Sequence, residues 1–202
     1  MAEEQVFVSH APSDLDLVQE LFSTVQNLHL DIHIALEQIE PGRNRQDLEG
    51  RLTNSDLLVV VLTEASATNR WVNQEIGYAV AKGIPILPLS ADGVELGGYL
   101  QRHEEVSLDP DEMEVTVFNL LARLRSELAP LGTLSTPNWF VRFPCNFENC
   151  GTTVTLDVEE IQKKLWQMFE HNQALVAGCE ECDAQYFFNP ATLGYVRRED
   201  PV

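Results

Sequence analysis

Basic residues are scarce in this sequence, and lysine is the scarcest of them. Lysine and arginine together account for 13 residues against 32 aspartates and glutamates, which gives a formal net charge of −19. A field of this sign repels nucleic acid and anionic membranes, so we expect neither as a partner. The acidic residues are spread along the chain and form no acidic tail. Two interpretations stay open, an acidic surface for a partner and a halophilic adaptation to screening salt, and we favour the second.

The sequence also lacks a long apolar run and a secretory signal. No stretch reaches the roughly 18 apolar residues that a membrane-spanning helix needs. A secretory signal starts with basic residues and continues with an apolar segment, whereas this sequence starts with Met1-Ala2-Glu3-Glu4. We therefore predict a cytoplasmic protein with no membrane partner.

Short apolar runs alternate with helical patterns over residues 5–129. The expected strands are residues 6–8, 32–34, 57–62, 84–89 and 106–108, and the expected helices lie at 15–28, around 48–52, at 70–82 and from 109 onward. Strand starts recur every 22–27 residues, which is typical of βαβ units. This pattern predicts an α/β protein with a flavodoxin-like, doubly wound, five-stranded parallel sheet.

Local signals add detail to this prediction. Residues 57–62 are apolar on both faces, as a central parallel strand requires. The two prolines within residues 84–89 argue against a central strand there. We expect Ser13 to cap the first helix and Gly83 to end the helix at 70–82.

The pattern changes near residue 130. Residues 131–137 have the composition of a linker, and they separate a domain at residues 1–130 from a module at residues 138–202. Short β-like pieces and one helical pattern predict a small α+β module. All four cysteines of the chain lie in it.

The cysteine spacing predicts a metal site. The cysteines are Cys145, Cys150, Cys179 and Cys182. Two close pairs brought together by a hairpin can supply four thiolates to a tetrahedral Zn²⁺ ion, and Gly151 can adopt the positive φ that such a turn needs. Two disulfides are the alternative, which a reducing cytosol disfavours. The pattern resembles a zinc ribbon with a lengthened first pair. We expect the zinc ion to be structural and to take no part in catalysis. We also expect His171 to lie at a helix end rather than to bind the metal.

Several polar residues are expected at one edge of the sheet. In an open parallel sheet, ligands bind beyond the carboxyl ends of the strands, where the strand order reverses. Ser9 and His10 follow the first strand, and Arg43 lies in the loop after the second. Trp71 and Glu75 are four residues apart on the helix after the third strand, so they share one helical face. Each also has an ordinary structural interpretation: a solvated glutamate, a packed tryptophan, a histidine that closes a strand, or a loop charge.

Residues 5–129 resemble a TIR (Toll/interleukin-1 receptor) domain of the prokaryotic kind. The similar segments are Val6-Phe7-Val8-Ser9-His10 with Asp14, Glu40-Pro41-Gly42-Arg43, Ser55 to Thr63, and Trp71-Val72-Asn73-Gln74-Glu75-Ile76-Gly77-Tyr78-Ala79. The last segment contains the W-x-x-x-E signature of the family. One departure is Asn69, two residues before the tryptophan, where the family often has serine.

The resemblance implies an activity and residue roles. Many TIR domains cleave the nicotinamide–ribose bond of NAD and release nicotinamide with linear or cyclic ADP-ribose, in signalling or defence. Glu75 would be the key catalytic carboxylate, and Trp71 would form one wall of the substrate pocket. Ser9 and His10 would line the nucleotide side, and Arg43 would meet the pyrophosphate. TIR enzymes commonly self-associate, so a homo-oligomer is implied.

Two other functions are alternatives. The first is a non-catalytic TIR interaction module that passes on a signal, against which the W-x-x-x-E signature argues. The second is a phosphoryl-accepting receiver of similar fold. Receivers carry acidic residues after the first strand, where this sequence has Ser9-His10-Ala11-Pro12, so this alternative is poor.

Overall fold

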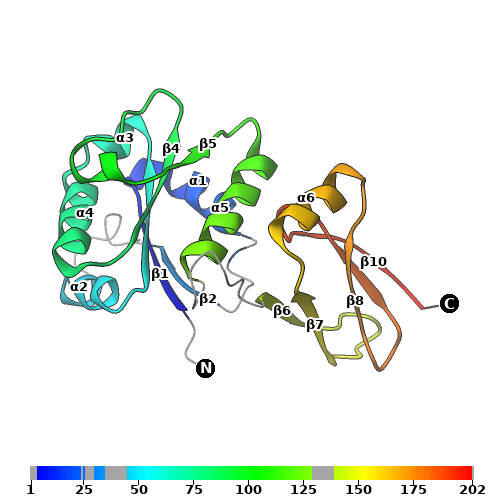
Figure 1. Cartoon of the computed structure of the whole chain (residues 1–202). Helices are drawn as coiled ribbons and strands as arrows, with labels where there is room; N and C mark the ends of the chain where they lie inside the picture. Colours follow the sequence, from blue (N-terminus) through cyan, green and yellow to red (C-terminus); the bar gives the residue numbers. More distant parts are fainter. Residues whose placement is uncertain (1–3, 24, 26–29, 35–44, 129–138, 202) are drawn as a thin grey trace.

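The computed structural model describes residues 4–23, 25, 30–34, 45–128 and 139–201, with the backbone alone for 45–48. Two parts lie side by side in Figure 1. An α/β part, blue to green, takes up the chain as far as α5, and a smaller part, yellow to red, follows it. The division into residues 1–130 and 138–202 stays a prediction. The predicted linker at 131–137 falls outside the described residues.

The first part is built on a parallel sheet of five strands. The strands are β1 (Glu4–Ser9), β2 (Leu30–Ile34), β3 (Leu57–Leu62), β4 (Ile86–Ala91) and β5 (Val106–Leu108). Their order is β2-β1-β3-β4-β5, and each neighbouring pair is parallel. The flavodoxin-like, doubly wound prediction is therefore confirmed, and the strand order reverses between β1 and β3.

Helices cover both faces of the sheet (Figure 1). They are α1 (Leu15–Phe22), α2 (Arg45–Thr53), α3 (Glu64–Ala67), α4 (Arg70–Lys82) and α5 (Met113–Glu127), with 3-10 turns at Pro12–Asp14 and Gly98–Arg102. All six residues of β3 are buried. Val59 and Val61 belong to the cluster that contains α1 and α5, whereas Leu58 and Val60 belong to the cluster that contains α2 and α4. This alternation explains why the strand is apolar on both faces.

Two local expectations were wrong. Ser13 does not cap α1, because a 3-10 turn at Pro12–Asp14 precedes the helix and moves its N-cap to Asp14. The prolines do not keep β4 from an internal place, since it pairs with both β3 and β5. Pro88 is tolerated there because β5 pairs with β4 only from Leu89 onward, so Pro88 faces no β5 partner.

The second part contains two antiparallel sheets and one helix. The strands β6 (Trp139–Pro144) and β7 (Thr153–Val158) form a hairpin. The helix α6 (Gln162–Glu170) follows, and then β8 (Leu175–Gly178), β9 (Gln185–Phe188) and β10 (Tyr195–Glu199) form a sheet of order β10-β9-β8. The predicted α+β character of this part is confirmed.

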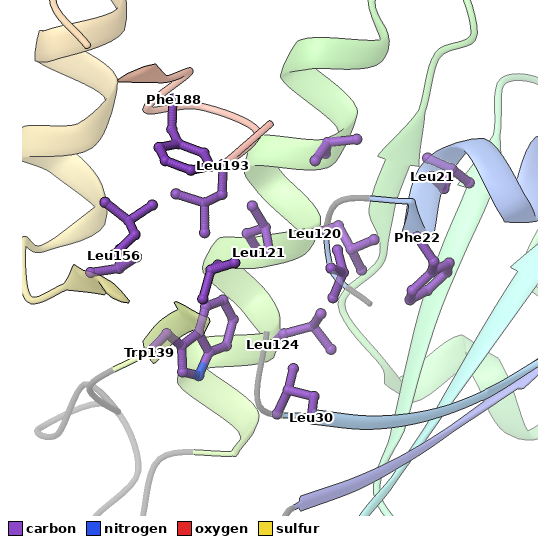
Figure 2. Packing of buried hydrophobic residues seen from close by; sticks show 14 of the residues in the cluster. Leu21, Phe22, Leu30, Leu120, Leu121, Leu124, Trp139, Leu156, Phe188 and Leu193 are labelled. Carbon is purple, nitrogen blue, oxygen red and sulfur yellow. The ribbon is translucent and has the colours of Figure 1, made fainter. Parts of the chain in front are cut away.

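The two parts share one hydrophobic cluster. Figure 2 shows Leu121 and Leu124 of α5 beside Trp139, which starts β6, with Leu156 and Leu193 also nearby. On the other side of α5, the same cluster continues to side chains of α1 and the sheet. Phe118 on α5 also contacts Trp166 on α6, with ring centroids 4.6 Å apart. The helix α5 is therefore buried from both sides.

A buried arginine joins the parts at this contact. Arg125 of α5 is 2% exposed. Its guanidinium donates to the carbonyl oxygens of Val158 and Glu160, at 3.2 and 2.9 Å, and to Oε1 of Gln162 at 2.5 Å. It also lies 5.4 Å from the centre of the Trp139 ring. Burial lowers the pKa of Arg125 to about 10, so the group is still charged at neutral pH.

Replacing Arg125 should weaken the whole fold. We expect Arg125→Ala to lower the free energy of unfolding by about 3 kcal/mol, because it leaves buried carbonyl oxygens without donors. Denaturant unfolding in high salt measures this change. The control is Arg123→Ala on the same helix, which removes half-exposed ion pairs to Glu104 and Glu127 and should cost about 1 kcal/mol or less. Equal losses in the two variants would contradict a special role for Arg125.

Candidate functional site

A buried serine–glutamate pair lies at the carboxyl edge of the sheet. Ser9 is the last residue of β1, and Glu75 lies in the middle of α4. The Ser9 hydroxyl donates a hydrogen bond to Oε2 of Glu75. Ser9 is 0% exposed and Glu75 is 7% exposed. The interpretation of Glu75 as an ordinary solvated glutamate is therefore wrong, since its carboxylate is buried and held from β1.

The cap of α4 determines where Glu75 lies. The side chain of Asn69 accepts hydrogen bonds from the backbone N–H groups of Trp71 and Val72, at 2.8 and 3.3 Å, and so caps the helix. The predicted end at Gly83 is confirmed, because that residue is left-handed with φ of 72°. Asn69 stands where the family often has serine, and asparagine caps a helix equally well.

Trp71 lies one helical turn before Glu75. It is half-buried, and the Arg70 guanidinium lies 5.1 Å from the centre of its ring. Spacing of four residues on an α-helix keeps the indole and the carboxylate on one face, as predicted. The indole is therefore a partly exposed flat surface on the helical face that carries Glu75.

His10 is fully buried next to this pair. Its Nδ1 lies 2.7 Å from the carbonyl oxygen of Ala11, so Nδ1 carries the hydrogen and donates it. Nε2 is left as a buried acceptor for which the described residues offer no hydrogen-bond partner. In this structure the imidazole is closed off from solvent. Arg43 lies outside the described residues, so its expected place stays a prediction.

Two further residues support this edge, and the sequence alone does not connect them. Thr63, directly after β3, donates from Oγ1 to Oδ2 of Asp14 at 2.7 Å. Thr63 also forms a capping box with Ser66 at the start of α3. Asp14 and Thr63 follow β1 and β3, two parallel strands whose carboxyl ends meet at this edge. Their position after these strands is the sequence signal from which their proximity could have been predicted.

The four cysteines form a second site. The Sγ atoms of Cys145, Cys150, Cys179 and Cys182 all lie within 4.8 Å of one another. The Sγ atoms of Cys145 and Cys182 are 3.5 Å apart, and those of Cys150 and Cys179 are 3.8 Å apart. Sulfurs placed about 2.3 Å from a tetrahedral zinc ion are about 3.8 Å apart. A disulfide needs about 2.05 Å, and all four thiols are free. The cluster therefore has the dimensions of a tetrahedral metal site.

The turns around the sulfurs also suit a metal. Three sulfurs accept hydrogen bonds from the backbone N–H two residues later, Cys145 from Phe147, Cys150 from Thr152 and Cys182 from Ala184. Gly151 has the predicted positive φ, at 69°. His171 lies at the end of α6, as predicted, with Nδ1 2.8 Å from the carbonyl oxygen of Gln167. N–H donors stabilise thiolates, which are the form that binds a metal.

The pKa values of the cysteine thiols also favour binding of a cation. Burial raises the pKa of the Cys145 thiol, but hydrogen bonds from the Tyr186 hydroxyl, the Phe147 N–H and the neighbouring Cys182 and Cys179 thiols outweigh burial and bring it to about 6. The N–H of Ala184 lowers the pKa of Cys182, but burial and the neighbouring sulfurs raise it to about 12. Thiols this close oppose one another's ionisation, and a divalent cation would supply the balancing charge. Tyr186 was not anticipated from the sequence.

No helix in the described part of the chain is long and apolar enough to cross a membrane. This finding agrees with the absence of a long apolar run. The predicted cytoplasmic location stays a prediction.

Comparisons with known proteins address the first part of the chain. Two solved structures are among those similar to this chain. One is the TIR domain of the Toll-related receptor TRR-2 from Hydra magnipapillata, with 18% identity, a TM-score of 0.48 and coverage of 59% of this chain and 97% of that chain. The other is the CMP N-glycosidase BcmB from Clostridium botulinum, with 17% identity, a TM-score of 0.42 and coverage of 58% and 97%. At these values we base no argument on either likeness. A search of curated proteins found no match.

A family model gives the decisive result. Residues 6–117, more than half of the 202 residues, match the model described as TIR domain. The match covers β1 through the first turn of α5, and it includes the Ser9–Glu75 pair and the W-x-x-x-E segment. The chain therefore belongs to the TIR domain family.

Proposed function

We propose that this chain cleaves the nicotinamide–ribose bond of NAD, as an NAD nucleosidase that releases linear or cyclic ADP-ribose. The observation that carries the proposal is the buried Glu75 carboxylate, held by the Ser9 hydroxyl at the carboxyl edge of the sheet. Doubly wound folds bind nucleotides at this edge, where the strand order reverses. The carboxylate is thereby fixed in place before a ligand arrives.

The chemistry suits a fixed anion. The C–N bond breaks and its electron pair goes to the ring nitrogen, so nicotinamide leaves neutral and positive charge develops on the ribose. Glu75 stabilises that charge and holds the ribose hydroxyls. Water then adds to the ribose carbon and loses a proton, which gives ADP-ribose; attack by the adenine ring gives the cyclic product. Ser9 keeps the carboxylate in one orientation.

The remaining residues have supporting roles in this proposal. Trp71, half-buried beside Glu75, provides a flat surface for a ring. Ser9 and His10 would line the nucleotide side from their place at the carboxyl end of β1. Arg43 contacts the pyrophosphate, supplying a local cation in a chain of net charge −19.

The test is incubation of the purified chain with NAD in high salt. Chromatography should show nicotinamide released in a one-to-one ratio with linear or cyclic ADP-ribose, and light scattering should show a homo-oligomer under the active conditions. No release of nicotinamide by the assembled protein would contradict the enzyme and favour the alternative, a non-catalytic TIR interaction module. Either function belongs to signalling, with defence as the proposed setting.

For the module at residues 138–202 we propose a structural Zn²⁺ ion bound by Cys145, Cys150, Cys179 and Cys182. The sulfur spacing, the N–H donors and the paired turns support this assignment. Four thiolates leave no open coordination position, so the ion would hold the fold and take no part in NAD cleavage. Residues 1–130 would then be the TIR domain, joined by 131–137 to this zinc-ribbon-like module.

A further inference from the structure

A cleft opens at the carboxyl edge of the sheet, beside α4. It has a volume of about 350 Å³ and lies between the end of β3, the helices α3 and α4, and the connection from β4 to β5. Of the residues proposed for NAD cleavage, the four that the structure describes, Ser9, His10, Trp71 and Glu75, do not line it. From α4, Asn73 and Ile76 border this cleft, whereas Glu75 bonds to Ser9 on β1. The cleft is thus separate from the proposed catalytic pair.

The inner wall of the cleft is apolar and its rim is aromatic. Leu62, Ile76 and Leu100 line it and are each nearly buried. Tyr99 stands at the rim and is 63% exposed, the largest exposure among the large hydrophobic residues of the described chain. Gly97 and Gly98 beside it have open space where a side chain would stand, and Gly98 has a positive φ of 57° that favours glycine. A planar ring can therefore enter beside an exposed phenol ring.

Apart from the Tyr99 hydroxyl, which can donate or accept, the polar side chains that line the cleft offer acceptors. Asn73 donates its amide hydrogens to the carbonyl oxygens of Ala67 and Asn69, so its Oδ1 remains as an acceptor. The Ser66 hydroxyl already donates to the Thr63 carbonyl oxygen. Glu95 adds an exposed carboxylate, and among the described residues no lysine, arginine or histidine lines the cleft. Acceptors without a cation select a ligand that brings N–H donors and no phosphate.

We propose that this cleft binds an uncharged planar heterocycle that carries N–H donors. The ring would stack on Tyr99 over the apolar wall, with its amino or amide group directed to Glu95 and Asn73. A nucleoside base and free nicotinamide share this chemistry. This site is independent of NAD cleavage, and it stands whether or not the chain is an enzyme.

The test titrates the full chain with adenosine, nicotinamide and AMP, followed by calorimetry and NMR. We expect saturable binding of adenosine or nicotinamide, which distinguishes the two sources, and weaker binding of AMP than of adenosine. Tyr99→Ala should weaken binding about tenfold, whereas Tyr99→Phe, which keeps the ring, should bind as the parent does. Glu95→Gln should reduce the difference between adenosine and AMP. Tyr99 and Glu95 are exposed, so these variants should fold normally.

Two controls show whether binding takes place in this cleft. Glu75→Gln should leave the affinity for adenosine and nicotinamide unchanged, because Glu75 does not line the cleft. Binding that is lost in Glu75→Gln but kept in Tyr99→Ala would overturn the proposal, as would the absence of saturable binding by both adenosine and nicotinamide. A shift in oligomeric state in Tyr99→Ala without a change in affinity would also overturn it, because Tyr99 would then serve contacts between copies.

Discussion

Glu75→Gln should reduce nicotinamide release from NAD at least about a hundredfold, while the protein stays folded. The substitution keeps the shape of the side chain, and the amide oxygen can still accept the hydrogen bond from Ser9. It removes the negative charge, which is the property that stabilises positive charge on the ribose. The measurement is the initial rate of nicotinamide release, with the thermal melting temperature recorded for both proteins.

The matched control is Glu20→Gln on α1. Glu20 is exposed and lies far along the chain from Glu75, so its loss removes the same charge from the chain without touching the catalytic pair. We expect the activity of this variant to equal that of the parent. Full activity in Glu75→Gln, or equal losses in both variants, would exclude Glu75 as the catalytic carboxylate. Loss of folding in Glu75→Gln would be seen directly in the melting curve.

Removal of metal should unfold the C-terminal module and lower the melting temperature of the chain by on the order of 10 °C. The strands β6 and β7 end and begin beside Cys145 and Cys150, and β8 and β9 beside Cys179 and Cys182, so the ion would tie two hairpins together. The loss should reach the TIR domain as well, because both parts share the cluster around α5. Calorimetry with and without a chelator measures the change, and native mass spectrometry should find one zinc ion per chain.

Variants identify the ligands independently of the chelator. Cys145→Ser and Cys179→Ser should each lose zinc, whereas His171→Gln should keep it, since the His171 side chain hydrogen-bonds its own helix. Unchanged melting after chelation, or zinc retained in both serine variants, would contradict the metal site. Zinc lost in His171→Gln with the cysteines intact would show that the ligand set is different.

The parallel sheet was predictable because its signals are local and repeated. Burial on both faces of a strand needs an unbroken apolar run, and Leu57 to Leu62 has one. The C-terminal end of α4 was predictable from Gly83, which adopts the positive φ that ends a helix. The four cysteines were recognisable by their spacing alone, and the short distances between their sulfurs in the fold agree with that spacing. These features depend on residues that are close together in the sequence or on the spacing of one residue type.

Other features depended on contacts between distant segments. Pro88 is acceptable in β4 because of where β5 begins to pair, and the burial of Arg125 depends on carbonyl oxygens more than thirty residues later in the chain. The contact of Ser9 with Glu75 joins residues 66 positions apart. Spacing on α4 placed Glu75 on the same face as Trp71, but it could not tell whether that face was buried.

The sequence by itself determined the succession of strands and helices, the resemblance to the TIR family and the four-cysteine pattern, because periodicity, helix-end signals and cysteine spacing act over a few residues or need no exact partner. Only the tertiary structure decided that the C-terminal part packs on α5, that Glu75 is buried against Ser9, and that a cleft opens beside α4. Those outcomes depend on contacts between side chains from distant segments. The burial and hydrogen bonds at such contacts are not encoded in any one segment.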